Sequence, residues 1–243
     1  ERFFGYRCID GMFVMTDNLK KYYAEVAPGN CRFMVMPAIV DVQKFDKVEV
    51  NEKDIDYVTY CGDFGGNKDG VADLLSAFIT IADKFPAVKL KLIGSTSEQH
   101  TLKKLYDMSK QANLADRIIF TGRLDHQAVA YNLKNSRVLA LARPANKQAE
   151  GGFPSKVGEY LATGNPVLVT RVGEIPLYLH DEINAFSVEP GDIGLFADKL
   201  AYILDNPEKA EKVGAAGKEL AMQMFDYRSV AGKMIDFMRV DNM

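Results

Sequence analysis

The stretch EGGFPSKVGEYLATGNPVLVT, residues 150–170, joins a short helix directly to an apolar strand. Pro154 suits the first position of a helix and Gly164 the position just past its end, so we expect a helix over residues 155–163. The apolar run at 167–170 is typical of a buried strand. A helix that leads through a tight turn into a buried strand is the repeating unit of a parallel sheet covered by helices.

The same alternation runs along most of the chain from residue 57 onward. We expect strands at residues 57–61, 88–93, 118–121, 138–142, 167–170 and 185–188, with amphipathic helices between them. Strands that alternate with helices predict an α/β fold class, here a Rossmann-like doubly wound parallel sheet.

The first part of the chain and its last part follow a different pattern. Strands are expected at 12–15 and 33–36, with a helix near 17–26 between them. Residues 37–55 lack a sustained period, which is typical of a linker. A last helix is expected at 225–238, where Val230, Met234 and Phe237 lie on one face that could pack against another domain.

The composition limits the classes of function. The 243 residues are 47% hydrophobic and 26% charged with a net charge of −3, which suits a soluble protein and gives no electrostatic reason to expect a nucleic-acid partner. Neither a membrane-spanning apolar run nor a signal peptide is visible, so we expect a cytoplasmic protein. The cysteines and histidines are scattered without a metal-binding pattern, and no metal is expected: Cys8, Cys31, Cys61, His100, His126 and His180.

The residues around the expected helix at 155–163 suit a sugar nucleotide. Gly151 and Gly152 allow a ligand to approach the backbone, and the amides of a helix start can donate to phosphate or sugar oxygens. The Glu159 carboxylate could accept from both hydroxyls of a ribose, and Glu150 from hydroxyls of a hexose. The alternative is that Lys156 and Glu159 form an ordinary solvated ion pair on the helix surface.

These motifs occur in an order that resembles the donor-binding half of a GT-B retaining glycosyltransferase of family 4, also called glycosyl transferases group 1. The resemblance covers most of the chain. The matching pieces are PAIVD (37–41), Gly62, Lys68 with Asp69 and Gly70, LIG (92–94), FTGRL (120–124), the glutamate motif, GNPVLVTRVGEIP (164–176) and NAFSVEPGD (184–192).

The resemblance implies roles for single residues. Lys68 would reach the donor diphosphate and stabilise the charge that the leaving group gains, although a solvated lysine is the alternative. The family usually has an arginine directly after the glycine of the first strand, and Asp63 stands there in this chain. Arg123, Lys156 or Arg143 could replace that arginine. The donor-binding residues are then Gly62, Arg123, Leu124, Gly151, Gly152, Phe153, Lys156 and Glu159, and the catalytic residues Lys68 and Glu150.

The paired glutamates also depart from the family pattern, which separates them by seven residues. Eight residues lie between Glu150 and Glu159, so Gly151 occupies the strict position of the first glutamate. Glu150 can contact the sugar only if the Gly151–Gly152 turn absorbs the extra residue. Glu174 follows the next strand and would either face the donor, as the resemblance implies, or cap the short helix after it.

Taken together, the resemblance implies a metal-independent, configuration-retaining glycosyltransferase that uses a nucleoside-diphosphate sugar of the UDP or GDP type, requires no cofactor and acts on an unidentified acceptor. Residues 1–36 would be the tail of an N-terminal acceptor domain that this chain lacks, 37–55 the linker, 56–224 the donor-binding domain and 225–243 a helix that returns toward the acceptor domain. The chain alone would then be inactive. The protein could lie peripherally on the inner face of the membrane. Two alternatives stay open: a GT-B epimerase or phosphorylase, and a degenerate nucleotide-binding module without catalysis.

Overall fold

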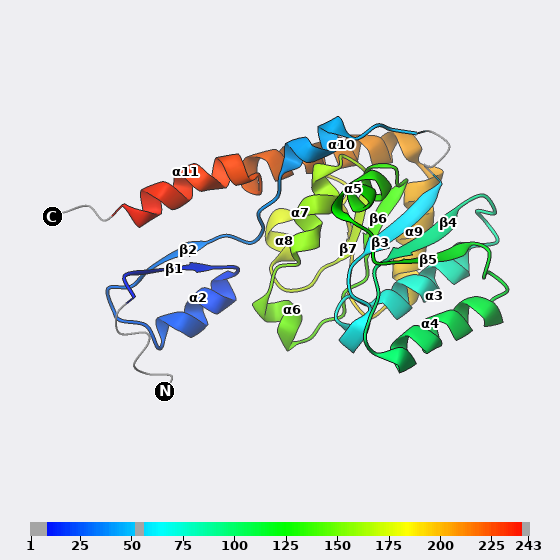
Figure 1. Ribbon diagram of the computed structural model, residues 1–243, viewed down its shortest axis with the longest axis horizontal. Helices are drawn as coiled ribbons and strands as arrows, with labels where there is room; N and C mark the ends of the chain where they lie inside the picture. The colour runs from blue at the N-terminus through cyan, green and yellow to red at the C-terminus, as the bar shows by residue number, and fades with distance from the viewer. Residues whose placement is uncertain (1–8, 52–55, 240–243) are drawn as a thin grey trace.

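The computed structural model describes residues 9–51 and 56–239. Its centre is a six-stranded, wholly parallel sheet in the order β5-β4-β3-β6-β7-β8 (Figure 1). The strands are β3 (Tyr57–Cys61), β4 (Lys89–Ile93), β5 (Ile118–Gly122), β6 (Val138–Leu141), β7 (Val167–Thr170) and β8 (Phe186–Val188). This order is that of a doubly wound sheet, and the predicted fold class is confirmed.

Helices cover both faces of the sheet (Figure 1). One face carries α3, α4 and α9, and the other carries α5, α7, α10 and the 3-10 turn η2. Their bounds are α3 (Val71–Ile81), α4 (Gln99–Gln111), α5 (His126–Lys134), α7 (Ser155–Ala162), α9 (Ile193–Asp205), α10 (Pro207–Met224) and η2 (Val42–Lys47). Because both faces are covered, every residue of β6 and of β7 is buried.

The segment before residue 37 forms a small unit beside the main sheet. In this unit β1 (Gly11–Val14) pairs in parallel with β2 (Arg32–Val35), and α2 (Asp17–Ala24) connects them. Figure 1 shows the unit opposite the ends of the main sheet that carry α6 (Lys147–Gly151) and α8 (Ile175–Tyr178).

The chain passes between the two parts twice, and the two crossings lie side by side. The amide of Val40 donates to the carbonyl of Phe225 (2.8 Å), and the amide of Tyr227 donates back to Val40 (3.0 Å). Beyond this point α11 (Tyr227–Met238) runs over the small unit, where the rings of Phe237 and Phe13 lie 5.1 Å apart. The last helix therefore contacts the first strand of the chain.

Most predicted elements are present with ends that differ by one residue at most in the strands. Three details differ. Pro154 is the residue before the first turn of α7 and not its first helical residue. The expected linker contains η2, because Val42 and Phe45 are apolar and are buried against the sheet layer. Met224 ends α10, and α11 begins only at Tyr227. The domain boundaries stay a prediction, and parts of them, residues 1–8, 52–55 and 240–243, lie outside the described residues.

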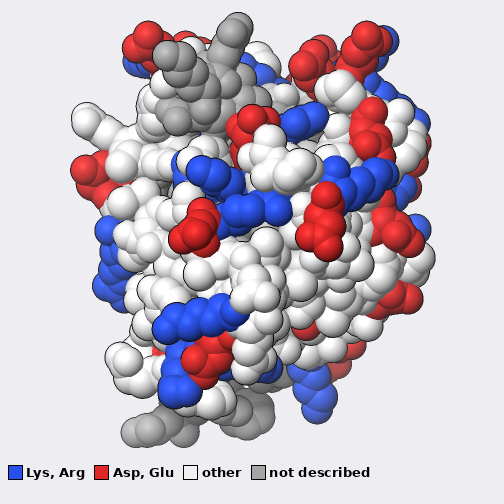
Figure 2. Space-filling view, turned by 90° about the vertical axis from the view of Figure 1, so that its right-hand side faces the viewer, with Lys and Arg blue, Asp and Glu red and all other residues white. Residues whose placement is uncertain are grey.

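The surface carries both signs of charge. Figure 2 shows Lys and Arg side chains beside Asp and Glu over the face at the right-hand side of Figure 1. A face on which the signs alternate does not form the basic patch that a nucleic acid requires.

Candidate functional site

The site predicted from sequence lies where the strand order reverses, between β3 and β6. The chain leaves β3 toward β4 on one side, and β6 continues the sheet on the other. In an open parallel sheet, ligands bind outside the carboxyl ends of the strands at such a switch point. In Figure 1 these ends face the small β1–α2–β2 unit.

A cleft of about 310 Å³ opens at this edge of the sheet. It is lined by residues at the carboxyl ends of three neighbouring strands and just beyond them: Cys61, Gly62 and Asp63 at β3, Ile93, Gly94 and Ser95 at β4, and Arg123, Leu124 and Val129 of α5 after β5. The structure therefore brings together Gly62, Arg123 and Leu124, which the resemblance assigns to the donor.

Helix α7 presses against the end of β3 and presents polar groups there. Val157, Tyr160 and Leu161 are fully buried, as their spacing predicts. The amide of Cys61 donates to the hydroxyl of Tyr160 (2.7 Å), which fixes the helix to the strand. Burial raises the pKa of Tyr160 well above its usual value, so this hydroxyl stays protonated. Helix α7 is thus a rigid carrier for Lys156 and Glu159.

Glu159 is half-exposed and forms an ion pair with Lys44 of η2 (2.8 Å). It also lies near Cys61. Burial, and then the Glu159 carboxylate, raise the pKa of the Cys61 thiol to about 11. The expected Lys156–Glu159 surface pair is not the one present, because each residue has its own partner elsewhere. A ribose that binds to Glu159 would compete with Lys44.

Lys156 extends across the end of β3 to a buried carboxylate. Its ammonium forms an ion pair with Asp69, whose side chain is only 1% exposed. The hydroxyl of Tyr60 lies 2.8 Å from the same carboxylate oxygen. A methyl group on Gly62 would lie 2.9 Å from Lys156 Cε and would overlap the Tyr60 hydroxyl, so this glycine makes room for both side chains.

Arg143, which follows β6, is the second buried cation of this region. Its side chain is nearly inaccessible, and one guanidinium nitrogen lies 3.3 Å from the carbonyl of Gln148 in α6. Within the described residues its Nε has no hydrogen-bond partner. Burial lowers the pKa of Arg143, and the nearby Asp69 carboxylate opposes this shift. Of the three substitutes for the family arginine, Arg143 and Lys156 thus lie near the same carboxylate, and Arg123 lines the cleft.

The loop between β3 and α3 carries Asp63 where the resemblance leads one to expect an arginine, and Lys68 where it leads one to expect a lysine. Lys68 is exposed and follows the short turn η4 (Gly65–Asn67). The exposed Asp63 accepts from the amide of Gly65 (2.6 Å), and Glu98 accepts from the amide of Gly66 (3.1 Å). The hydrogen bonds from Thr101 and Gly66 lower the pKa of Glu98. These two amides already have anionic partners.

The first glutamate of the motif is exposed on α6, whose last residue is Gly151. Its backbone is held by the small unit: Asn18 Nδ2 donates to the carbonyl of Glu150 (2.9 Å), and the Thr16 hydroxyl donates to the carbonyl of Gly151 (3.0 Å). Gly152 is extended and starts the passage to α7. The extra residue of the motif is thus taken up by the end of α6.

Glu174 is buried and does not cap the short helix α8 with its side chain. Its Oε1 accepts from the amide of Asn18 (3.2 Å), in the first turn of α2. The expectation that Glu174 caps α8 is wrong, because the carboxylate points to the small unit instead. Phe153, predicted to bind the donor, is buried between Tyr178 and Phe225, so a ligand could reach only its backbone.

Sequence reasoning missed Asp69, Tyr60 and Lys44 as members of this region. Asp69 carries a signal, because it stands between Lys68, which matches the family lysine, and Gly70. Tyr60 lies within an apolar strand and Lys44 in the expected linker, so neither has a signal of its own.

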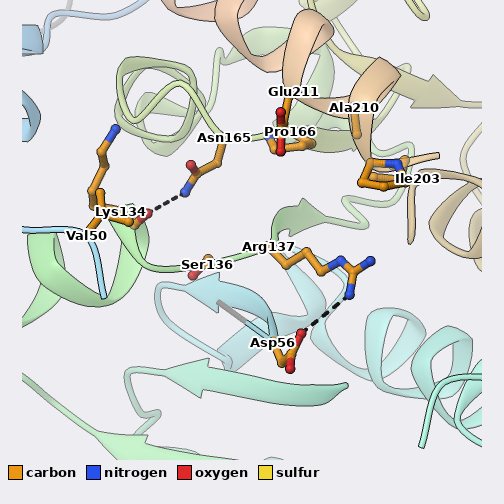
Figure 3. A pocket seen from close by; sticks show the side chains of 11 residues that line it. Val50, Asp56, Lys134, Ser136, Arg137, Asn165, Pro166, Ile203, Ala210 and Glu211 are labelled. Atoms are coloured by element: carbon orange, nitrogen blue, oxygen red, sulfur yellow. Dashed lines mark hydrogen bonds and ion pairs between the residues drawn. The ribbon is translucent and has the colours of Figure 1, made fainter. Parts of the chain in front are cut away.

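A different pocket of about 330 Å³ lies at the opposite edge of the sheet (Figure 3). Its residues precede strands: Asp56 comes before β3, Arg137 before β6 and Pro166 before β7. Arg137 and Asp56 form an ion pair across it (3.4 Å). Because it lies at the amino ends of the strands, it is separate from the switch point.

Two further properties concern residues 9–51 and 56–239 as a whole. These residues contain no group of three His, Cys, Asp or Glu side chains placed to hold a metal ion. They also contain no helix with both the length and the apolar character needed to cross a membrane.

The doubly wound sheet is the fold of GT-B glycosyltransferases. The chain belongs to the family Glycosyl transferases group 1, whose model matches residues 41–220. The resemblance seen in the sequence is confirmed at the level of family and fold.

Named relatives are glycosyltransferases. The GDP-mannose-dependent alpha-(1-6)-phosphatidylinositol monomannoside mannosyltransferase of Mycobacterium tuberculosis is 25% identical over 177 residues, covering 71% of this chain and 45% of that protein. The N-acetyl-alpha-D-glucosaminyl L-malate synthase of Bacillus anthracis is 27% identical over 155 residues, covering 64% of this chain and 38% of that protein. The chain thus spans less than half the length of these two relatives.

Solved structures share the fold. Anabaena Alr3699/HepE in complex with UDP-glucose superposes with a TM-score of 0.81 at 16% identity, covering 96% of this chain and 64% of that chain. The C-terminal domain of the glycosyl transferase group 1 family protein LpcC from Francisella tularensis superposes with a TM-score of 0.68 at 24% identity, covering 77% of this chain and 99% of that chain.

Proposed function

We propose that this chain forms the donor-binding half of a retaining glycosyltransferase that uses a nucleoside-diphosphate sugar. The observation that carries the proposal is the cleft at the switch point, with Gly62 and Arg123 on its wall and Lys156 of α7 packed against Gly62. The names of the relatives support the donor class, since one is GDP-mannose-dependent and one structural neighbour holds UDP-glucose.

The residues fit the parts of such a donor. Arg123 and Leu124 would contact the base through their loop, Lys156 with Arg143 would face the diphosphate, and Glu159 would hold the ribose diol after releasing Lys44. Glu150 would contact the sugar from the end of α6. Lys68 keeps its proposed place at the diphosphate only if the loop 63–70 rearranges, because its side chain is exposed here.

The reaction requires position and charge more than a nucleophile. In front-face transfer the bond from the anomeric carbon to the phosphate oxygen breaks, and a bond to the acceptor oxygen forms on the same face. The proton of the acceptor hydroxyl passes to the departing phosphate. Fixed cations at the diphosphate stabilise this transition state more than the ground state.

A series of thermal-shift measurements tests the donor site. UDP, GDP, ADP, CMP and dTDP are added to the wild-type chain and to Lys156→Met and Glu159→Ala. A nucleotide at 100 times its dissociation constant should stabilise the chain by about 2.7 kcal/mol. We expect a shift with a UDP- or GDP-type nucleotide that both substitutions reduce. A folded wild-type chain without any shift would contradict the proposal.

The second candidate is a nucleotide-binding module without catalysis. It is favoured by Asp63 and Asp69 in the loop after β3 and by the two ion pairs that occupy Lys156 and Glu159. A full-length protein that binds a nucleotide, yet neither hydrolyses nor transfers any sugar donor, would support this candidate over the first.

A further inference from the structure

Lys156 and Asp69 form an ion pair at the switch point, and their side chains differ in exposure to solvent. The Asp69 side chain is 1% exposed, whereas that of Lys156 is 18% exposed. Lys156 passes over Gly62, which lines the cleft. Lys156 is therefore the more exposed partner of the pair, and its side chain lies beside a residue of the cleft wall.

The position of the carboxylate is fixed by its neighbours. Asp69 directly precedes Gly70, which has a left-handed backbone (φ 66°) and packs against the carbonyl of Ala142, leaving no room for a side chain. The Tyr60 hydroxyl, 2.8 Å away, holds the carboxylate from the strand. Asp69 Oδ1 has no hydrogen-bond partner within the described residues. Neither the backbone nor the side chain of Asp69 can follow Lys156 if the lysine moves.

Such a pair adds little to stability by itself. Removing two charges from water costs as much as their attraction returns, and a buried pair is often no better than apolar residues of the same volume. A carboxylate that is expensive to bury, and whose cation lies beside the cleft wall at Gly62, is better explained by what it does to that cation.

We infer that Asp69 is a positioning residue, whose carboxylate holds the Lys156 ammonium at the end of β3 where it meets the diphosphate of the donor. The inference rests on the proposed function and deepens it. An ammonium has three hydrogens, so Lys156 can donate to Asp69 and to a phosphate oxygen at the same time. Lys68, which matches the family lysine, is exposed in the loop before Gly70, whereas Lys156 comes from α7 and has its anchor, Asp69, in that loop.

The net charge of this cluster also affects how tightly an anionic ligand binds. Lys156 and Arg143 carry two positive charges and Asp69 one negative charge, which leaves a net charge of +1 for the cluster. Asp69 therefore acts on affinity in two opposite ways, by orienting Lys156 and by repelling phosphate. If Asp69 positions Lys156, the orientation of the ammonium has the larger effect on affinity. Removing the carboxylate should then weaken the binding of a diphosphate.

The test compares a nucleoside diphosphate with its nucleoside by calorimetry on the 243-residue chain, using the nucleotide that the wild type binds. Asp69→Asn keeps the size of the side chain and removes its charge. We expect the diphosphate to bind about tenfold more weakly and the nucleoside to bind within twofold of the wild type. In a Lys156→Met background, Asp69→Asn should cause no further loss. The matched control is Asp107→Asn, which breaks the Lys103–Asp107 pair on α4 and should change neither affinity.

Three outcomes would overturn the inference. Tighter binding of the diphosphate to Asp69→Asn would mean that repulsion dominates. An equal loss for nucleoside and diphosphate would mean a structural role only. A folded wild type that binds no nucleotide would remove the proposed function and this inference together, a pattern distinct from the first two. If Asp69→Asn does not fold, Tyr60→Phe replaces it: a selective loss of about threefold for the diphosphate is expected, and an unchanged or non-selective affinity overturns the inference.

Discussion

Two segments meet at the switch point and differ in how they use charge. Helix α7 presents Lys156 and Glu159 on a buried apolar base, as the family pattern predicts. The loop after β3 presents Asp63 where the family pattern has an arginine, and it carries Asp69 beside the matching Lys68. The end of the loop is held in place, because Asp69 is buried beside the Tyr60 hydroxyl and Gly70 packs against the carbonyl of Ala142, so the departure in the loop is not a loss of structure. It teaches that a site can keep its fold while the source of its charges moves from one element to another.

The strongest test of the difference between the two segments deforms the loop after β3 and leaves the motif around α7 unchanged. Gly70→Ala places a methyl group on the carbonyl of Ala142 and imposes a left-handed backbone on alanine. We expect a loss of about 3 kcal/mol in the free energy of unfolding, measured by urea denaturation.

The matched control is Gly151→Ala. A methyl group there meets no atom within 4 Å, so its effect should stay below about 1 kcal/mol. Equal effects of the two substitutions would contradict the view that the loop is held rigidly against β6.

The next prediction separates the two glutamates. If Glu159 holds the ribose diol, the wild type should bind 2′-deoxy-UDP, or 2′-deoxy-GDP if it prefers guanine, about tenfold more weakly than the ribonucleotide, a loss of about 1.4 kcal/mol. Glu159→Gln should bind both forms with nearly equal affinity. Calorimetric titration of the four combinations measures the difference.

Glu150→Gln serves as the comparison within this experiment. Because Glu150 lies on α6 and is proposed to contact the sugar, we expect this variant to bind the nucleotide sugar more weakly. Its preference for the ribonucleotide should be unchanged. If Glu159→Gln kept the full preference for the ribonucleotide, the ribose role of Glu159 would be wrong.

The sequence predicted the sheet well because its strands are buried on both faces. Continuous apolar runs such as VLVT at 167–170 leave little choice of element, and the structure has that strand unchanged. The sequence also predicts the end of α7 well, because Gly164 has the left-handed backbone (φ 80°) that ends a helix.

The charges of the site were harder to predict because their partners are far apart in the sequence. Lys156 pairs with a residue 87 positions earlier, and Lys44 reaches Glu159 across 115 positions. Patterns within one helix or one strand cannot predict pairs of residues that lie this far apart in the sequence. Glu174 shows the same limit, because its partner is the amide of Asn18 in a different part of the fold.

The last prediction concerns the point where α7 meets β3. Burial and the Glu159 carboxylate raise the pKa of Cys61 to about 11, above the value near 8.5 of a thiol in an unfolded chain. Because the folded pKa is raised, the stabilisation is fully present below about pH 8.5 and is lost as the pH rises through 11. Stability should fall by at most about 3 kcal/mol from this group. Thermal melts between pH 8 and 11 measure it, with Cys61→Ala as the comparison.

The alanine variant should lose less stability over this window, although the raised pKa of Tyr160 leaves it some alkaline sensitivity. Parallel curves for the two proteins would mean that the thiol is not held in the low-dielectric contact between α7 and β3, and that the helix is a looser carrier of Lys156 and Glu159 than its packing indicates.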